Sequence, residues 1–236
     1  MKQSQAKKHD NTMTNKILMR LIALVLGLLF LEILIIHSKN EQQKSVSNQV
    51  QTARIMANGD LLYHDGLYMS ALQADGSYDF TENFTYVKPW LKQADLVLGD
   101  FEGTINPDYP LSGYPLFNAP QSVTAAISDA GYDVMDLAHN HILDSGLEGA
   151  FTTADAFKEV GIDPVGVYEN PVRDKAPLFI KNVNGIKVAI LSYAYGFNGL
   201  ESNLTEKEIA NHLSNLDEKR MKVEIERAEK EADVTV

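Results

Sequence analysis

Hydrophobic residues follow different patterns before and after about residue 53. Residues 17–36 form an apolar run that only Arg20 and Glu32 interrupt. At about 1.5 Å per residue, a helix of this length matches a bilayer core of roughly 30 Å. The run therefore predicts one transmembrane helix, preceded by a tail at residues 1–16. The polar residues 37–53, which lack Phe, Trp and Tyr, are typical of a stalk.

Basic residues around this run predict its orientation. Four lysines precede residue 17, whereas Lys39 and Lys44 are the two that follow closely. Because the side richer in Lys and Arg stays in the cytoplasm, we expect a cytoplasmic N-terminus and an extracellular domain. A cleaved signal peptide and a buried core helix are the alternatives. The length of the run and the poor cleavage site after it favour an uncleaved signal anchor in the cell membrane.

From residue 54 onward, short apolar runs alternate with segments of helical spacing. This alternation predicts an α/β fold with a largely parallel sheet. Asn184-Gly185 lies between two apolar runs and predicts a β-hairpin, which would make the sheet mixed. We expect strands at residues 54–58, 95–99, 132–137, 178–183, 187–192 and 233–236, and helices at residues 84–94, 123–130, 147–160 and 204–232.

The sequence ends within an apolar run that resembles a strand. Residues 232–236 repeat the pattern of residues 94–98, where a helix leads into a buried strand. Because a domain rarely ends in a strand without a following loop or partner, we expect the sequence to be a fragment or a truncated product.

Composition and charge narrow the class of protein. The 236 residues are 44% hydrophobic and 22% charged, which is typical of a globular protein. The absence of cysteine excludes a disulfide scaffold, a thiolate zinc site and a cysteine nucleophile. Residues 1–53 carry a net charge of +4 and residues 54–236 carry −15. We therefore expect no nucleic-acid partner, since phosphate binding needs a basic surface.

Side chains that bind metals follow each of the first three expected strands. The carboxyl ends of parallel strands meet at one edge of a sheet, where ligands bind. Hard divalent cations take carboxylate and carbonyl oxygens, and borderline ones also take imidazole. The sequence therefore predicts a site for one or two metal ions. Its candidate residues are Asp60 and His64, then Asp100 and Glu102, then His139, Asn140, His141 and Asp144.

Each cluster also has a plainer interpretation. Asp60 could be a turn or cap residue, and Glu102 a solvated carboxylate. His139 and His141 could be structural, and Asp144 could cap the next helix. Their shared position at strand ends favours a joint site.

The order and spacing of three motifs resemble the CapA family of capsule and poly-γ-glutamate biosynthesis proteins. The motifs here are Gly59-Asp60, residues 95–103 and residues 138–146. The corresponding family patterns are Gly-Asp, Asn-Leu-Glu and Asn-Asn-His-x-x-Asp-x-Gly. The resemblance covers residues 54–236 and implies a layered αββα sandwich with a mixed sheet, similar to calcineurin-like metallophosphoesterases. It also implies that this chain holds the N-terminal part of the domain.

The resemblance assigns roles to five residues. Asp60, Glu102 and Asn140 would be metal ligands. His141 would act beside the substrate as an acid or an orienting donor. Asp144 would order the third loop through His141 or by capping the helix. The bound cofactor would be one or more divalent metal ions, with manganese, zinc and iron as the candidates.

Three positions depart from the family patterns or from the wider fold. Asp100 replaces the usual Asn of the second motif, and His139 replaces the first Asn of the third motif. Phosphoesterases of the wider fold have Asp-x-His in the first motif, whereas here His64 lies four residues after Asp60. All three are further possible ligands. The family's later His-x-Gly and Gly-His-x-x-His segments, which supply the remaining ligands, are absent from this sequence.

The resemblance implies a membrane-anchored extracellular protein of capsule or poly-γ-glutamate biosynthesis or export. Its expected partners are the membrane, an anionic polymer and other capsule-synthesis proteins. A metal-dependent phosphoesterase or amide hydrolase is an alternative, and a non-catalytic scaffold is another. Because residues 54–236 are acidic, an anionic polymer would need cations to bind them.

Overall fold

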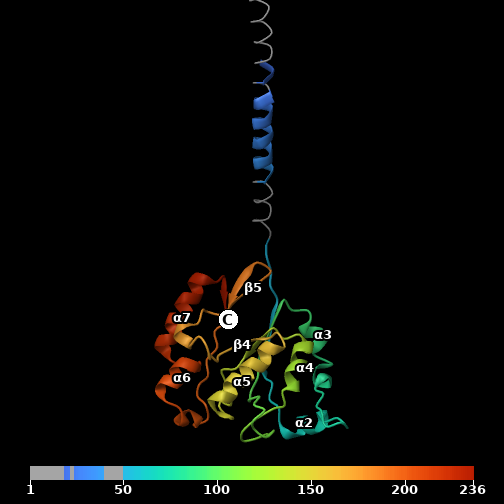
Figure 1. Cartoon of the computed structure of the whole chain (residues 1–236), viewed down its shortest axis with the longest axis vertical. Coiled ribbons are helices and arrows are strands. Elements are labelled where there is room, and N and C mark those ends of the chain that lie inside the picture. Colours follow the sequence, from blue (N-terminus) through green and yellow to red (C-terminus); the bar gives the residue numbers. More distant parts are fainter. Residues whose placement is uncertain (1–18, 22–23, 40–49) are drawn as a thin grey trace, which may run out of the picture. The chain divides into compact units, whose positions relative to one another are not determined.

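The computed structural model of the chain describes residues 19–21, 24–39 and 50–236 (Figure 1). The chain divides into two compact units, Met1–Val50 and Gln51–Val236. The expected tail at residues 1–16 and most of the expected stalk lie outside the described residues.

Within the described part of the first unit, one helix is long and apolar enough to cross a membrane. This helix, Met19–Lys39, has a mean hydropathy of 2.6. Its length and composition are consistent with membrane anchoring. At the start of the second unit, the Asn184 side chain donates a hydrogen bond to the Thr52 carbonyl at 3.1 Å. The end of the expected stalk therefore lies against the predicted hairpin.

The first sheet of the second unit has four parallel strands in the order β1-β2-β3-β4. Its register places Asp60 beside Asp100, and Asp100 beside Asp136. All three aspartates therefore lie at the carboxyl edge of the sheet. The strands are β1 (Ile55–Asp60), β2 (Leu96–Asp100), β3 (Val134–Asp136) and β4 (Asp163–Val165).

The predicted hairpin belongs to a second sheet, with the order β5-β6-β7. Strands β5 (Ile180–Val183) and β6 (Ile186–Ala189) are antiparallel, and β7 (Val234–Thr235) pairs with β6 in parallel. Asn184 and Gly185 both have positive φ, at 54° and 87°. This is the conformation that a two-residue hairpin turn requires. We expected the hairpin to make a single sheet mixed. The structure instead has a parallel first sheet and a mixed second sheet.

Two hydrophobic clusters hold these layers together. The larger lies between the first sheet and α4 and α5, and its fully buried side chains include Phe101, Ile127 and Phe157. The smaller joins residues of the two sheets: Leu96, Val134 and Val165 with Val183, Val188 and Ile190. Helix α7 contacts β6 and β7. In Figure 1, α4 lies on the right of the unit, α6 and α7 lie on the left, and α5 lies between them.

The helices and 3-10 turns are short, and most connect strand ends. They are α2 (Asp65–Ala71), η1 (Thr81–Phe84), α3 (Lys88–Leu91), α4 (Ser122–Ala130), α5 (Gly146–Glu159), η2 (Arg173–Lys175), η3 (Leu200–Asn203), α6 (Glu206–His212) and α7 (Glu218–Glu231).

Two expected helices are wrong as continuous elements. Residues 84–94 contain only the end of η1 and the single turn α3, because Pro89 suits a helix start and not a helix interior. Residues 204–232 divide into α6 and α7. Between them the Ser214 N–H donates to the Gly166 carbonyl at 3.0 Å, and Asp217 then caps α7. Charged residues are dense throughout residues 204–232, so the sequence pattern did not show where one helix ends and the next begins.

Candidate functional site

Asp100 is the central member of the three aspartates at the carboxyl edge of the first sheet. Burial, together with the nearby carboxyls of Asp136, Asp60 and Glu102, raises the pKa of its carboxyl to about 7. Asp100 Oδ1 is buried and has no hydrogen-bond partner among the described residues. A buried oxygen without a donor indicates that a positively charged or protonated group belongs beside it.

Glu102 extends this carboxylate cluster into the loop after β2. Burial and the neighbouring Asp60 raise the pKa of Glu102 to about 7, although His141 opposes the rise. Among the described residues, no Lys or Arg contributes to the shift of Asp100 or Glu102. Asp60, Asp100 and Glu102 therefore form an acidic cluster whose one basic neighbour is His141.

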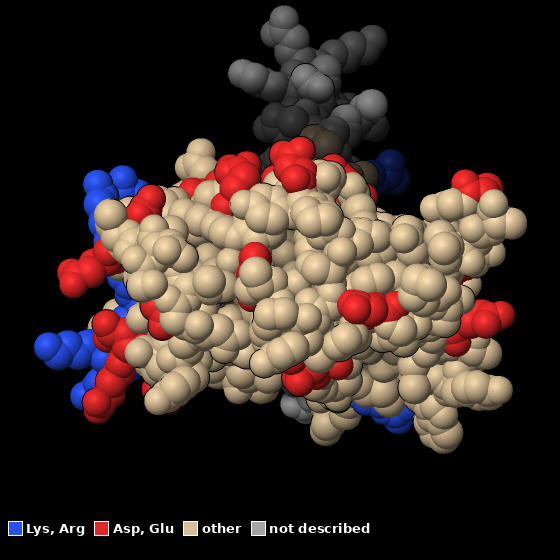
Figure 2. Space-filling view, turned by 90° about the horizontal axis from the view of Figure 1, so that it is seen from below, with Lys and Arg blue, Asp and Glu red and all other residues tan. Residues whose placement is uncertain are grey.

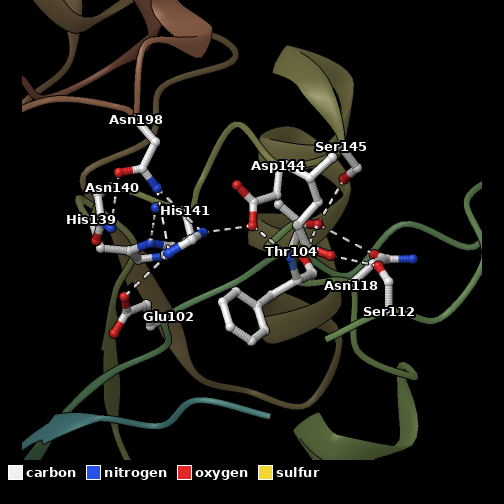
Figure 3. Close-up of polar contacts among 12 residues, drawn as sticks. Glu102, Thr104, Ser112, Asn118, His139, Asn140, His141, Asp144, Ser145 and Asn198 are labelled. Atoms are coloured by element: carbon white, nitrogen blue, oxygen red, sulfur yellow. Dashed lines mark hydrogen bonds and ion pairs between the residues drawn. The ribbon is translucent and has the colours of Figure 1, made fainter. Parts of the chain in front are cut away.

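His141 is fixed by Asp144 and by an aromatic ring (Figure 3). Its Nδ1 atom lies 2.7 Å from Asp144 Oδ2, and the same oxygen accepts the Phe117 N–H at 2.6 Å. The Phe117 ring lies edge-on to the imidazole, with ring centroids 4.8 Å apart. His141 Nε2 is 3.8 Å from Glu102 Oε1. Asp144 thus holds Nδ1, and Nε2 lies on the side of the acidic cluster.

The surroundings of the Asp144 carboxyl also shift its pKa. Burial raises its pKa, while the Phe117 N–H and His141 oppose that rise. Of the two roles considered for Asp144, the structure shows the contact with His141. The residue before α5 is Ser145, whose side chain makes no cap bond to the helix.

Asn140 and Asn198 come together from loops far apart in the sequence. Asn140 Nδ2 donates to Asn198 Oδ1 at 3.2 Å, and Asn198 Nδ2 lies 3.4 Å from both ring nitrogens of His141 (Figure 3). Asn198 therefore contacts both Asn140 and the imidazole of His141. Asn198 was missed in the sequence, because it follows β6 in an irregular segment with no recognised motif.

His139 and His64 each use Nδ1 in a local backbone bond. His139 Nδ1 accepts the His141 N–H at 3.1 Å, and burial lowers its pKa to about 3, so the ring is neutral. His64 Nδ1 accepts the Asp65 N–H at 2.8 Å and caps α2. Both histidines therefore shape the loops of the site, and a ligand role for either stays a prediction.

Asp136 is a further residue that sequence reasoning missed. Burial raises its pKa, and its carboxylate accepts hydrogen bonds from the Ser192 hydroxyl and the Ala138 N–H. The available signal was its position at the end of the third strand, level with Asp100. Asp136 ties the start of the third loop to the segment after β6.

The donor atoms of the acidic cluster suit a divalent cation. Within the described residues, no group of three or more His, Cys, Asp and Glu side chains stands in a geometry that would hold a metal ion. The chemistry nevertheless fits: Asp60, Asp100 and Glu102 offer carboxylate oxygens, and one of these oxygens is buried without a partner. Binding would require these side chains to turn toward a common point.

The parallel sheet and the polar cluster at its carboxyl edge define an α/β protein with its candidate site at the strand ends. The chain matches the model of the bacterial capsule synthesis protein PGA_cap over residues 54–236 and belongs to this family. The family assignment predicted from the three motifs is thereby confirmed.

Two relatives share this family resemblance. The capsule biosynthesis protein CapA of Bacillus anthracis is 35% identical over 119 residues, which cover 48% of this chain and 29% of the relative. The PGA biosynthesis protein CapA of Bacillus subtilis (strain 168) is 25% identical over 189 residues, which cover 79% of this chain and 48% of the relative. The chain thus spans less than half of either relative's length.

Proposed function

We propose that the chain is a membrane-anchored component of capsule or poly-γ-glutamate biosynthesis or export whose globular unit works outside the membrane. Family membership and the names of the two Bacillus proteins support the pathway. The apolar helix Met19–Lys39 supports anchoring, and the excess of lysine before it supports the orientation.

The fold we infer is the αββα sandwich of metallophosphoesterase-like proteins. The hydrophobic cluster shared by the two sheets supports the inner layers. The helices α4 and α5 on one sheet and α7 on the other support the outer layers. In this arrangement the loops after β1, β2 and β3 share one end of the sandwich.

One observation supports a metal-dependent site most strongly: the acidic cluster lies within reach of an imidazole that a buried carboxylate holds. Asp60, Asp100 and Glu102 would hold the cation, with Asn140 nearby, and a bound cation would supply positive charge that stabilises an anionic oxygen. Asp144 keeps the proton of His141 on Nδ1. His141 Nε2 is then placed to accept a proton, or to donate one when the ring is protonated.

The proposal is tested in the bacterium that makes the protein, by measuring surface polymer in strains that carry single variants of the full chain. Asp60→Ala and His141→Ala should abolish polymer at unchanged protein level. Asp75→Ala, which changes an exposed carboxylate at the turn after α2, should leave polymer at the wild-type amount. Normal polymer in both site variants would contradict a role for the site and would favour the scaffold.

The contact between His141 Nε2 and Glu102, at 3.8 Å, also supports a metal-dependent hydrolase. In that case the purified full chain should cleave a phosphoester or a γ-glutamyl amide with Mn²⁺ or Zn²⁺. Cleavage should stop after chelation and in the Asp60→Ala and His141→Ala variants. Equal turnover in all these samples would contradict the hydrolase.

A further inference from the structure

A groove runs along the segment Tyr109–Asn118, which we call the covering loop. The groove has a volume of about 690 Å³. Asp144 and Ser145 also line it, so one part of the groove lies next to the residue that holds His141. Its other wall comes from α2. The large side chains that line it include Met69, Tyr78, Tyr109, Leu111, Tyr114 and Leu116.

The covering loop is rigidly held to the rest of the site. Asn118 Oδ1 accepts the Asn106 N–H at 2.8 Å, and Asn118 Nδ2 lies within 3.2 Å of the carbonyls of Asn106, Tyr109 and Pro110. Thr104 Oγ1 donates to the Phe117 carbonyl at 2.9 Å and accepts from Ser145 (Figure 3). These bonds preform the groove before any ligand arrives.

The covering loop also approaches α2 closely. A Cβ atom on Gly113 would stand 2.0 Å from Asp65 Oδ1 and 3.0 Å from His64 Nδ1. Glycine therefore allows the loop and the start of the helix to meet. Since His64 caps that helix and its ring also lies edge-on to Phe117, the same contacts join the groove wall to the loops of the site.

The groove exposes large apolar and aromatic side chains to solvent. Tyr114 is 76% exposed, Met69 is 71% exposed and Tyr109 is 51% exposed. Such side chains gathered in a concave surface are typical of a binding site. Tyrosine rings offer a flat apolar face together with a hydroxyl for hydrogen bonding.

The charge of the groove selects the ligand. Among the described residues that line it, Asp65 and Asp144 carry charge and none is Lys or Arg. The end of the unit that includes α2 is mostly uncharged in Figure 2, with scattered Asp and Glu, and with Lys and Arg toward the edges. A polyanion would be repelled here and would find no cation for its carboxylates. An uncharged chain of sugar rings suits the tyrosine faces, and its hydroxyls can donate to Asp65.

We propose that this groove binds a neutral glycan chain beside the candidate site. This inference is independent of the proposed function of the site. Binding in the groove requires neither a metal nor turnover. An experiment can therefore contradict the groove inference and leave the proposed function of the site intact, or the reverse. Tyr114 and Tyr109 are then specificity-determining residues of the capsule protein.

The experiment measures calorimetric binding to the full chain, in a detergent without a sugar headgroup and with EDTA present. The neutral probe is a β-1,4-linked N-acetylglucosamine hexamer, and the anionic probe is poly-γ-glutamate of similar length. We expect the hexamer to bind and poly-γ-glutamate not to bind. Tyr114→Ala should weaken hexamer binding roughly tenfold, through loss of ring contact.

Matched variants separate the groove from the site and from general damage. Tyr86→Ala removes a tyrosine that is 88% exposed and does not line the groove, and it should leave binding unchanged. Asp60→Ala should keep hexamer binding even where polymer synthesis is lost. The inference is overturned if the hexamer fails to bind at millimolar concentration, if Tyr114→Ala and Tyr86→Ala bind it equally, or if poly-γ-glutamate binds under EDTA and Tyr114→Ala weakens it.

Discussion

Asp144 Oδ2 lies 2.7 Å from His141 Nδ1 and is at the same time the acceptor of the Phe117 N–H. One carboxylate oxygen therefore sets the imidazole and anchors the covering loop. This shared oxygen makes the geometry of the candidate site depend on the wall of the neighbouring groove.

Replacing Asp144 by Asn should destabilise the fold as well as the site. A neutral amide oxygen is a weaker acceptor, and the buried Phe117 N–H and His141 Nδ1–H then compete for it. We expect a loss of about 1–3 kcal/mol in the free energy of unfolding, measured by urea denaturation of the full chain. Asp155→Asn, at an exposed pair with Lys158, should cost less than about 1 kcal/mol. Equal losses in the two variants would contradict the shared-oxygen account.

The acidic cluster should make stability depend on pH. The pKa values of Asp100 and Glu102 rise from 3.8 and 4.5 to about 7 in the fold, so the folded state binds more protons than the unfolded state between these values. The contribution of these two carboxyls to stability is therefore greatest below their unfolded pKa values and is lost as pH rises toward 7. With EDTA, we expect the free energy of unfolding to fall by roughly 2 kcal/mol between pH 5 and pH 8.

Two further measurements identify the cause of this pH dependence. Asp100→Asn, which replaces the carboxyl by an uncharged amide of similar size, should flatten the slope because one raised carboxyl is removed. Mn²⁺ should stabilise the wild-type protein more at pH 8 than at pH 5, since protonated carboxyls bind cations poorly. An Asp100→Asn slope identical to that of the wild type would show that other groups cause it.

A buried ion pair joins η2 to α7 and should be essential for stability. The Arg173 side chain is 1% exposed and donates to Glu224 through Nε at 3.1 Å and Nη2 at 2.9 Å. Arg173→Met leaves the Glu224 carboxylate without its cation, and we expect a loss of about 3–5 kcal/mol in urea unfolding. The double variant Arg173→Met/Glu224→Leu should lose less than the single variant.

The control for this pair is Arg227→Met, which breaks an exposed contact with Glu231 on the same helix. It should change stability by less than about 1 kcal/mol. A double variant that is less stable than Arg173→Met would contradict the argument that the unpaired charge is the source of the loss.

Part of the site could be predicted from the sequence because strand ends converge. Asp60, Asp100 and Glu102 each lie at or after the end of a short strand, and parallel strands bring such positions to one edge. The short motif His139-Asn140-His141 likewise follows the third strand, which brings the imidazole of His141 near Glu102. For these residues, local pattern and global topology agree.

The remaining contacts depend on loops whose paths no periodic pattern determines. Asn198 reaches His141 from 57 positions away, and Phe117 reaches Asp144 from 27 positions away. Asp136 looked like part of a buried strand, although its carboxylate bonds Ser192. The break between α6 and α7 depends on backbone bonds between Ser214 and Gly166, which amphipathic spacing does not report.

Titration of the full chain with Mn²⁺ at pH 7.5, followed by the loss of the free Mn²⁺ electron paramagnetic resonance signal, tests the central claim most directly. We predict saturable binding that Asp60→Asn and Glu102→Gln each weaken at least about tenfold, as loss of one carboxylate ligand requires. Asp75→Asn, at an exposed carboxylate outside the cluster, should bind like the wild type. Absence of saturable binding, or equal affinity in all four proteins, would contradict a metal site at the strand ends.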